Sequence, residues 1–190
     1  MPEKPRLILA SASPRRQELL KNAGIEFVVR PADIAEVPLA NESPVEFAER
    51  MAKEKARAVL SSSPESIVLA ADTVVAVGDQ ILGKPENEQD AARMLHLLSG
   101  RTHSVTTAVC VAGANFEDVR SEKTEVEFSA MTGDEIREYV QTGEPMDKAG
   151  AYAIQGRASR WITKVDGDYY NVVGLPVDLV WRMLREHTQL

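Results

Sequence analysis

Cysteine is almost absent from this sequence, which contains Cys110 and no other. A lone cysteine excludes an intramolecular disulfide and a zinc site built from cysteines. Cys110 lies in the strand-like run 108–111, so we expect a buried structural thiol rather than a nucleophile.

Long apolar segments are also missing. No stretch approaches the roughly 20 residues that a membrane helix needs. Residues 1–5 lack the apolar core of a signal peptide. We therefore expect no membrane association and a cytoplasmic location.

Positive charge is scarce, because 29 Asp and Glu outnumber 22 Lys and Arg and leave a net charge of -7. With no run of five basic residues and only 5% aromatics, the chain does not resemble a nucleic-acid-binding module. The three histidines show no metal-ligand or triad spacing, and no serine stands in G-x-S-x-G, so acyl-transfer chemistry is not expected. A few local cations would still suffice to bind one polyphosphate.

The 190 residues are 44% apolar and 27% charged, which is typical of a single globular domain with one sizeable core. Predicted strands and helices interleave, and several strands are joined by hairpins, so we expect an α/β fold with a mixed central sheet. The strands are predicted at residues 6–10, 25–29, 67–77, 80–82, 103–111 and 119–128. The helices are predicted at residues 13–24, from Ser43 to about Leu60, at 87–98, at 132–143 and from Pro176 onward. Residues 160–165 and 169–173 flank a turn at Asp166-Gly167.

The segment 11–16 follows the first strand and opens the first helix, with Ser13 as the cap and proline at the first helical position. A helix start attracts anions through free backbone N–H groups and the helix dipole. The hydroxyls of Ser11 and Ser13 and the guanidinium of Arg15 or Arg16 add donors that suit phosphate. The alternative is an ordinary capped helix with two surface arginines.

Two charged residues stand where the local pattern does not favour them, and a third is held in a tight turn. Lys55 falls on the apolar stripe of the second helix, so it needs a partner or an anionic ligand, unless it extends to the edge of the core. Asp72 interrupts an apolar strand, where a carboxylate must be paired, metal-bound or placed at a strand end facing a cleft. Lys84 sits in a tight Gly/Pro turn, where a surface lysine is the simpler interpretation.

The segment 143–156 is rich in glycine and encloses Asp147, Lys148 and Gln155. Such a loop can approach a ligand closely, and the amide of Gln155 can read the edge of a base. A purely structural loop is the alternative.

Five motifs, in this order along the chain, closely resemble the Maf family of nucleoside triphosphate pyrophosphatases over residues 7–184. They are segments 11–16, 71–73, 83–85, 147–156 and 173–176. The resemblance implies a fold like that of the inosine triphosphate pyrophosphatases, with a mixed twisted sheet and two lobes around a cleft, often in a homodimer. It also implies cleavage between the α and β phosphates with Mg²⁺ or Mn²⁺.

The resemblance implies roles for individual residues. Asp72 matches the family's catalytic base, although the sequence does not separate a base from a metal ligand. Segment 11–16, Lys55 and Lys84 match the groups that hold phosphates.

Arg15, Thr73 and Gln155 match the branch that acts on dTTP and UTP. A second branch, which acts on 7-methyl-GTP, has Gln after the aspartate and Glu in place of Gln155.

One motif departs from the family. Many members carry two adjacent acids before the second helix, one of them linked to metal binding, whereas here the segment 33–36 keeps only the second, Glu36. We therefore expect Asp72 and Glu36 as metal ligands, with Asp33 as an alternative to Glu36.

A different class of function also fits the resemblance. Maf proteins are associated with arrest of septum formation, so the chain could be a regulatory nucleotide-binding protein.

Overall fold

A computed structural model describes residues 6–188 and confirms the mixed α/β fold. Seven strands form one sheet with the order β2-β1-β3-β5-β6-β7, and β4 pairs with β3 outside this path. The strands are β1 (Leu7–Leu9), β2 (Val28–Val29), β3 (Ile67–Val77), β4 (Gln80–Leu82), β5 (Thr102–Gly113), β6 (Phe116–Phe128) and β7 (Ile162–Asp166). β1 runs parallel to β2 and β3, and the other pairs are antiparallel. A two-residue turn at Gly78-Asp79 joins β3 and β4 in a hairpin.

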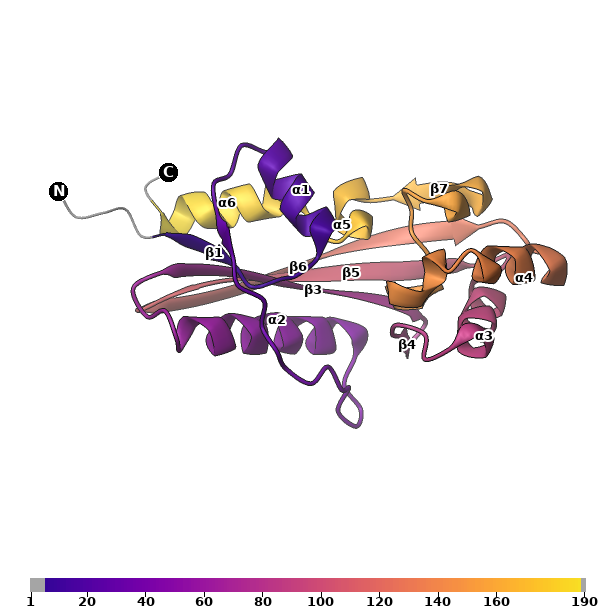
Figure 1. Cartoon of the computed structure of the whole chain (residues 1–190), viewed down its shortest axis with the longest axis horizontal. Coiled ribbons are helices and arrows are strands. Elements are labelled where there is room, and N and C mark those ends of the chain that lie inside the picture. The colour runs from indigo at the N-terminus through magenta and orange to yellow at the C-terminus, as the bar shows by residue number, and fades with distance from the viewer. Residues whose placement is uncertain (1–5, 189–190) are drawn as a thin grey trace.

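Helices cover both faces of the sheet (Figure 1). Below the long strands lies α2, while α1 and α6 lie above, and α3 and α4 lie at the far end with β4. The α-helices are α1 (Pro14–Asn22), α2 (Pro44–Leu60), α3 (Glu88–Leu98), α4 (Gly133–Gln141), α5 (Tyr169–Val173) and α6 (Val177–His187). Three short 3-10 helices are η1 (Glu144–Asp147), η2 (Ala149–Ala151) and η3 (Arg157–Trp161).

Helix starts follow the predicted capping signals. Ser43 and Thr132 each form a capping box with the glutamate three residues later, and Ser13 and Asn87 cap α1 and α3. Side chains at these positions accept hydrogen bonds from backbone N–H groups that the helix leaves unpaired, so the local sequence marks where these four helices begin.

The second predicted strand is wrong in length, because only Val28–Val29 of residues 25–29 pair in the sheet. The neighbouring β1 is three residues long and offers few pairing positions. Ile25 is also committed elsewhere, since its N–H donates to Leu20 O at 3.0 Å and closes α1. Residues 169–173 form the short helix α5, capped by Asp168, after the turn at Asp166-Gly167.

Three groups of buried apolar side chains form the core. One packs α2 against one face of the sheet, and a second packs α1 and α6 against the other face. A third lies at the far end, where α3, α4 and the 3-10 segments cover β4 and the ends of β5 and β6. The first two groups form one lobe and the third group forms the other, so the long strands are shared by two lobes.

Cys110 is buried as predicted, and burial raises the pKa of its thiol to about 12. Within residues 6–188, no helix combines the length and apolar character needed to cross a membrane.

The edge of β3 explains where a cleft can open. β1 pairs with Ile67 to Leu69 on this edge, and β4 pairs with Val75 to Val77 further along the same strand. The intervening stretch, which includes Asp72 and Thr73, pairs only with β5 on its other side. Side chains on both faces of β3 can therefore reach a common opening at this gap.

Buried His103 predicts a loss of stability in acid. Its ring lies in the far-end core, 2% exposed, with Nε2 2.8 Å from Tyr152 Oη, and burial lowers the pKa from 6.5 to about 4. The unfolded chain therefore binds a proton at higher pH than the folded chain does. We expect stability to be complete above pH 6.5 and to fall by about 3 kcal/mol as pH decreases toward 4.

Denaturant unfolding of the wild type and His103→Gln across this range measures the effect. The variant lacks the titrating ring, so its stability should change less with pH. Equal pH dependence in both proteins would contradict the assignment.

Candidate active site

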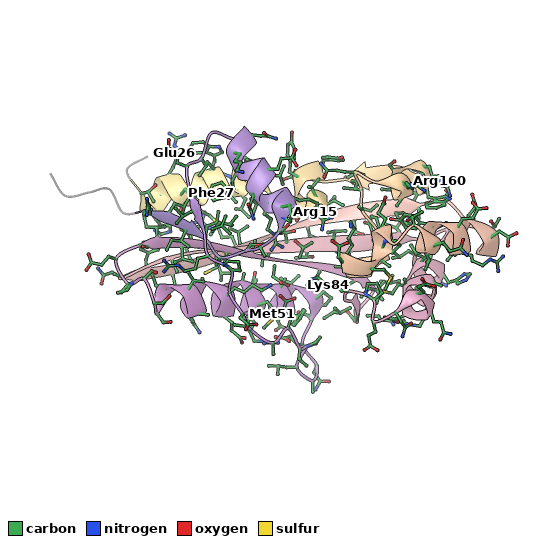
Figure 2. The ribbon with its side chains drawn as sticks, in the orientation of Figure 1. Arg15, Glu26, Phe27, Met51, Lys84 and Arg160 are labelled. Carbon is green, nitrogen blue, oxygen red and sulfur yellow. The ribbon has the colours of Figure 1, made fainter. Side chains whose placement is uncertain are left out.

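A cleft of about 530 Å³ opens at the gap in the β3 edge, between the two lobes. Segments far apart in the chain line it, and most of the predicted site residues are among them. The predicted residues that line it are Ser11, Ser13, Arg15, Arg16, Glu36, Lys55, Asp72, Thr73, Lys84, Asp147 and Lys148. Figure 2 shows two of them, Arg15 at the start of α1 and Lys84 just beyond β4, near the middle of the molecule.

Gln155 and Asp33 are the predicted residues that the structure does not bring to the cleft. Gln155 is exposed in the turn between η2 and η3, and Asp33 is exposed three residues before Glu36. Of the two alternatives for the acid before α2, Glu36 therefore lies at the cleft.

Lys55 joins two carboxylates at the centre of the cleft. Its Nζ lies 2.6 Å from Asp72 Oδ1 and 2.7 Å from Glu36 Oε1. Lys55 is 8% exposed and Asp72 is 5% exposed, so the pair is buried. The helical stripe that seemed unsuited to a lysine faces β3, which explains why Lys55 is paired rather than extended to solvent.

The surroundings shift the pKa values of the two acids in opposite directions. Burial raises the pKa of Asp72, and the charges of Lys55 and Arg16 only partly offset this. Burial also raises the pKa of Glu36, but its hydrogen bond to Lys55 and the charges of Lys55 and Lys84 outweigh it, so the net pKa is lowered. These shifts make Asp72 a stronger base than an ordinary aspartate and Glu36 a weaker base than an ordinary glutamate.

Arg16 is held by the protein itself. Its guanidinium donates to Gly174 O at 2.8 Å, Ala71 O at 2.9 Å, Thr73 Oγ1 at 3.0 Å and Ser11 Oγ at 3.2 Å. The Ala71 carbonyl lies on the unpaired stretch of the β3 edge, so Arg16 supplies the donor that a neighbouring strand would have supplied.

Arg15 differs from Arg16 although the two are adjacent. Its side chain makes no hydrogen bond to any residue among 6–188, and it lines the cleft. Of the two predicted arginines, Arg15 is therefore available to a ligand, whereas the hydrogen bonds of Arg16 stabilise the fold.

The segment that comprises η1, Lys148 and η2 carries the second group of predicted residues. Lys148 Nζ donates to Glu144 O at 2.9 Å and to Asp147 Oδ1 at 2.5 Å, and this contact lowers the pKa of Asp147. Gly150 donates its N–H to Gly83 O at 3.1 Å, which ties the loop to the turn before Lys84. Gly150 has φ +69°, and a Cβ there would lie 2.7 Å from a methyl group of Val75, so glycine is required.

Sequence reasoning missed the apolar part of the cleft. Val75, Val105, Tyr152 and Val172 also line it. Strand periodicity marks Val75 and Val105 as buried, but nothing local indicates that they border an opening. The cleft thus combines cations and a helix start, which suit phosphates, with an apolar wall that suits a flat ring.

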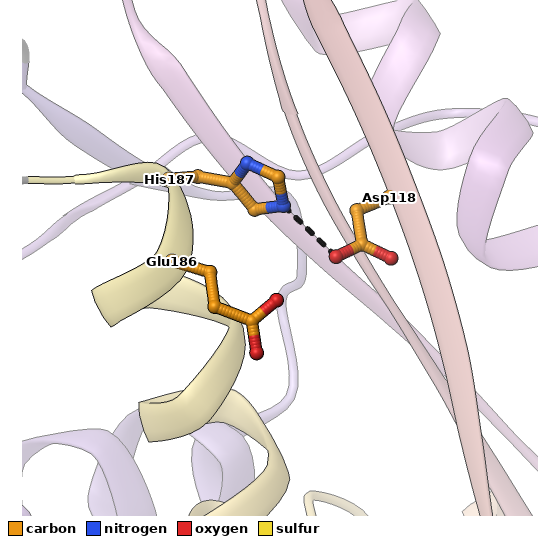
Figure 3. A group of neighbouring side chains, drawn as sticks. All are labelled: Asp118, Glu186 and His187. Carbon is orange, nitrogen blue, oxygen red and sulfur yellow. Dashed lines mark hydrogen bonds and ion pairs between the residues drawn. The ribbon is translucent and has the colours of Figure 1, made fainter.

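A second group of acids lies outside the cleft. Asp118, Glu186 and His187 bring their ligand atoms within 4.8 Å of one another (Figure 3). Arg120 already bonds to both acids, with Nη2 2.7 Å from Asp118 Oδ2. His187 Nε2 lies 2.9 Å from Asp118 Oδ2 and its ring stacks on Phe116 at 4.3 Å. These contacts fasten the end of α6 to β6.

The fold and the cleft together define an α/β protein that places cations, a helix start and an apolar wall around a buried carboxylate. This chain belongs to the Maf family, since the family described as "Maf-like protein" matches residues 6–187.

Relatives support this membership along nearly the whole chain. A dTTP/UTP pyrophosphatase of Koribacter versatilis is 54% identical and covers 94% of this chain and 93% of its own length. One from Symbiobacterium thermophilum is 51% identical and covers 95% and 93%. Among solved structures, a HAM1 protein from Coxiella burnetii matches 96% of this chain and 99% of its own, with TM-score 0.53 and 18% identity. That likeness confirms the predicted fold.

Proposed function

We propose that this chain hydrolyses dTTP and UTP to the nucleoside monophosphate and pyrophosphate. The observation that carries the proposal is the Asp72–Lys55–Glu36 group in a cleft lined by further cations. The relatives named dTTP/UTP pyrophosphatase, about half identical over nearly the whole chain, support the substrates.

Cations from both lobes receive the triphosphate. Arg15 and the start of α1 lie on one side of the cleft, and Lys84 and Lys148 lie on the other. Their positive charge holds the phosphates in the ground state and stabilises the negative charge that develops on the leaving pyrophosphate. The apolar wall at Val105 and Tyr152 receives the base.

Asp72 acts as the general base. Its Oδ1 is held by Lys55, while Oδ2 accepts no hydrogen bond from the described residues. Oδ2 takes a proton from a water molecule as the water oxygen bonds to the α-phosphorus, and the bond between this phosphorus and the bridging oxygen breaks. The electron pair leaves with pyrophosphate. The raised pKa of Asp72 strengthens it as a base.

We propose that Glu36 and Asp72 hold the Mg²⁺ or Mn²⁺ that the family resemblance implies. The two carboxylates converge on one ammonium group, and Glu36 Oε2 accepts no hydrogen bond from residues 6–188, so the donor set fits a hard cation while Asp72 Oδ2 stays available to the attacking water. A bound divalent cation would neutralise charge on the phosphate oxygens. Lys55 keeps the two carboxylates together.

Thr73 and Gln155 are proposed to select the base, and Arg15 is the third residue that matches the dTTP/UTP branch. Arg15 and Thr73 line the cleft, whereas Gln155 contributes only if its turn moves toward the cleft on binding. The homodimer and the cytoplasmic location stay predictions.

A substrate panel with pyrophosphate detection tests the proposal. With Mg²⁺ or Mn²⁺ we expect release from dTTP and UTP, little from 7-methyl-GTP, and none after a chelator removes the metal. Faster release from 7-methyl-GTP would favour the other branch. Tight binding of dTTP without release would favour a regulatory nucleotide-binding protein instead.

A further inference from the structure

Buried polar side chains behind the cleft are joined by hydrogen bonds that are not part of the pairing between strands. Asn171, in α5, is 0% exposed. Its Nδ2 donates to Val105 O at 3.0 Å and to Thr124 Oγ1 at 2.9 Å, and its Oδ1 accepts from Thr107 N at 2.9 Å. All three hydrogen bonds cross from a helix to the sheet, so they fix α5 on β5 and β6.

Thr107 extends this hydrogen-bond network from α5 to β3. It is 0% exposed and lies opposite Thr73 in the register of β3 and β5. Its hydroxyl is 3.0 Å from the backbone oxygen of Asn171 and 2.9 Å from Thr73 Oγ1. A carbonyl oxygen only accepts, so the single proton of Thr107 goes to Asn171. The hydroxyl of Thr73 has two acceptors, Thr107 Oγ1 at 2.9 Å and Gly174 O at 3.4 Å, and it donates to Thr107 at the shorter distance.

The direction of these bonds extends to Arg16. Thr73 has given its proton to Thr107, so its oxygen is free to accept from Arg16 Nη2 at 3.0 Å. Arg16 also bonds to Ser11, to the carbonyl beside Asp72, and to Gly174 just after α5. The chain of donors therefore runs from Arg16 through Thr73 and Thr107 to Asn171.

We propose that Thr107 and Asn171 are positioning residues for the hydrolysis proposed above, on which this inference rests. They orient Thr73 and Arg16 and thereby hold the phosphate-binding segment 11–16 in a fixed place relative to Asp72. Neither residue is among those that line the cleft, so both act through Thr73 and Arg16 rather than by touching the substrate.

Because Thr107 and Asn171 act through Thr73 and Arg16, their loss should change kcat more than KM. Arg15, Lys84 and Lys148 bind the phosphates without this set of bonds, so ground-state binding should persist when Thr107 loses its hydroxyl. The alignment of the α-phosphorus with Asp72 depends on this set of bonds, so it should be lost. A small misplacement of reacting groups costs rate far more than affinity.

Thr107→Val tests the inference, with Thr106→Val as the matched control. Thr106 is the next residue on the same strand, 2% exposed, and its hydroxyl makes no hydrogen bond among the described residues. For Thr107→Val we expect kcat per folded protein to fall about tenfold or more, with KM within about threefold of wild type. Thr106→Val should keep kcat within about twofold, and Thr107→Ser, which restores the hydroxyl, within about threefold.

Folding is checked by thermal unfolding, and if Thr107→Val does not fold, Thr107→Ala is compared with Thr106→Ala. Equal kcat in Thr107→Val and Thr106→Val, or in the two alanine variants where these are used, overturns the inference and leaves the proposed function standing. A Thr107→Ser variant as slow as Thr107→Val does the same. Absence of pyrophosphate release by the wild type overturns both.

Discussion

Asp72→Asn is expected to lower kcat by about 10²–10⁴-fold and to leave the fold intact. Asparagine keeps the shape of the side chain but cannot take a proton from water at neutral pH. The substitution also removes a buried negative charge, and Lys55 keeps its contact with Glu36 at 2.7 Å. Pyrophosphate release from dTTP and UTP, together with thermal unfolding of the variant, measures both effects.

Asp118→Asn is the matched control, because Asp118 is also an ion-paired acid on a strand but belongs to the group that fastens α6. We expect its kcat per folded protein to equal that of the wild type. Near-normal turnover in Asp72→Asn would exclude Asp72 as the base and would leave its carboxylate at most a minor role.

Lys55→Met is expected to show the second largest effect, on activity and on stability together. Without the ammonium, the charge of Arg16 alone opposes the effect of burial on Asp72, so the pKa of Asp72 rises further. The base works only when deprotonated, so activity is lost as pH falls through this pKa. The acid limb of the rate profile should therefore move to higher pH in the variant.

The same shift predicts how stability depends on pH. A carboxyl group whose folded pKa exceeds its unfolded value destabilises the fold as pH rises from the unfolded value through the folded one. We expect Lys55→Met to lose about 3 kcal/mol at neutral pH and to regain part of it in mild acid. Denaturant unfolding at several pH values measures this.

Lys55→Arg keeps the charge but replaces a point-like ammonium with a planar fork, so it should retain most of the stability and less of the activity. An acid limb at the same pH in Lys55→Met and in the wild type would contradict the pairing of Lys55 with Asp72.

Much of the fold could be predicted because its signals are local. Ser43 and Thr132 mark helix starts with glutamates three residues later, and Gly78-Asp79 marks a hairpin. Prediction failed where pairing depends on a neighbour. The segment 25–29 has strand-like composition, but the length of β1 decides how much of it pairs.

The candidate site could be predicted where a residue violates its local pattern. Asp72 in an apolar strand and Lys55 on an apolar helix stripe each require a partner, and they are each other's partner. Thr107 and Asn171 gave no such signal, because a threonine is ordinary in a strand and a lone asparagine is ordinary near a turn. Their bonds join residues 64 positions apart, a separation that no local pattern encodes.

The sequence by itself determined the kinds of groups available, the start of each main helix, and the need for a partner at Asp72, because these follow from bonds and periodicities within a few residues. Only the tertiary structure decided that Arg16 braces the β3 edge while Arg15 stays available, and that Gln155 lies outside the cleft. Neighbours in the chain point in different directions around a helix. The strand edge, turn or carbonyl that each one meets comes from segments that folding alone brings together.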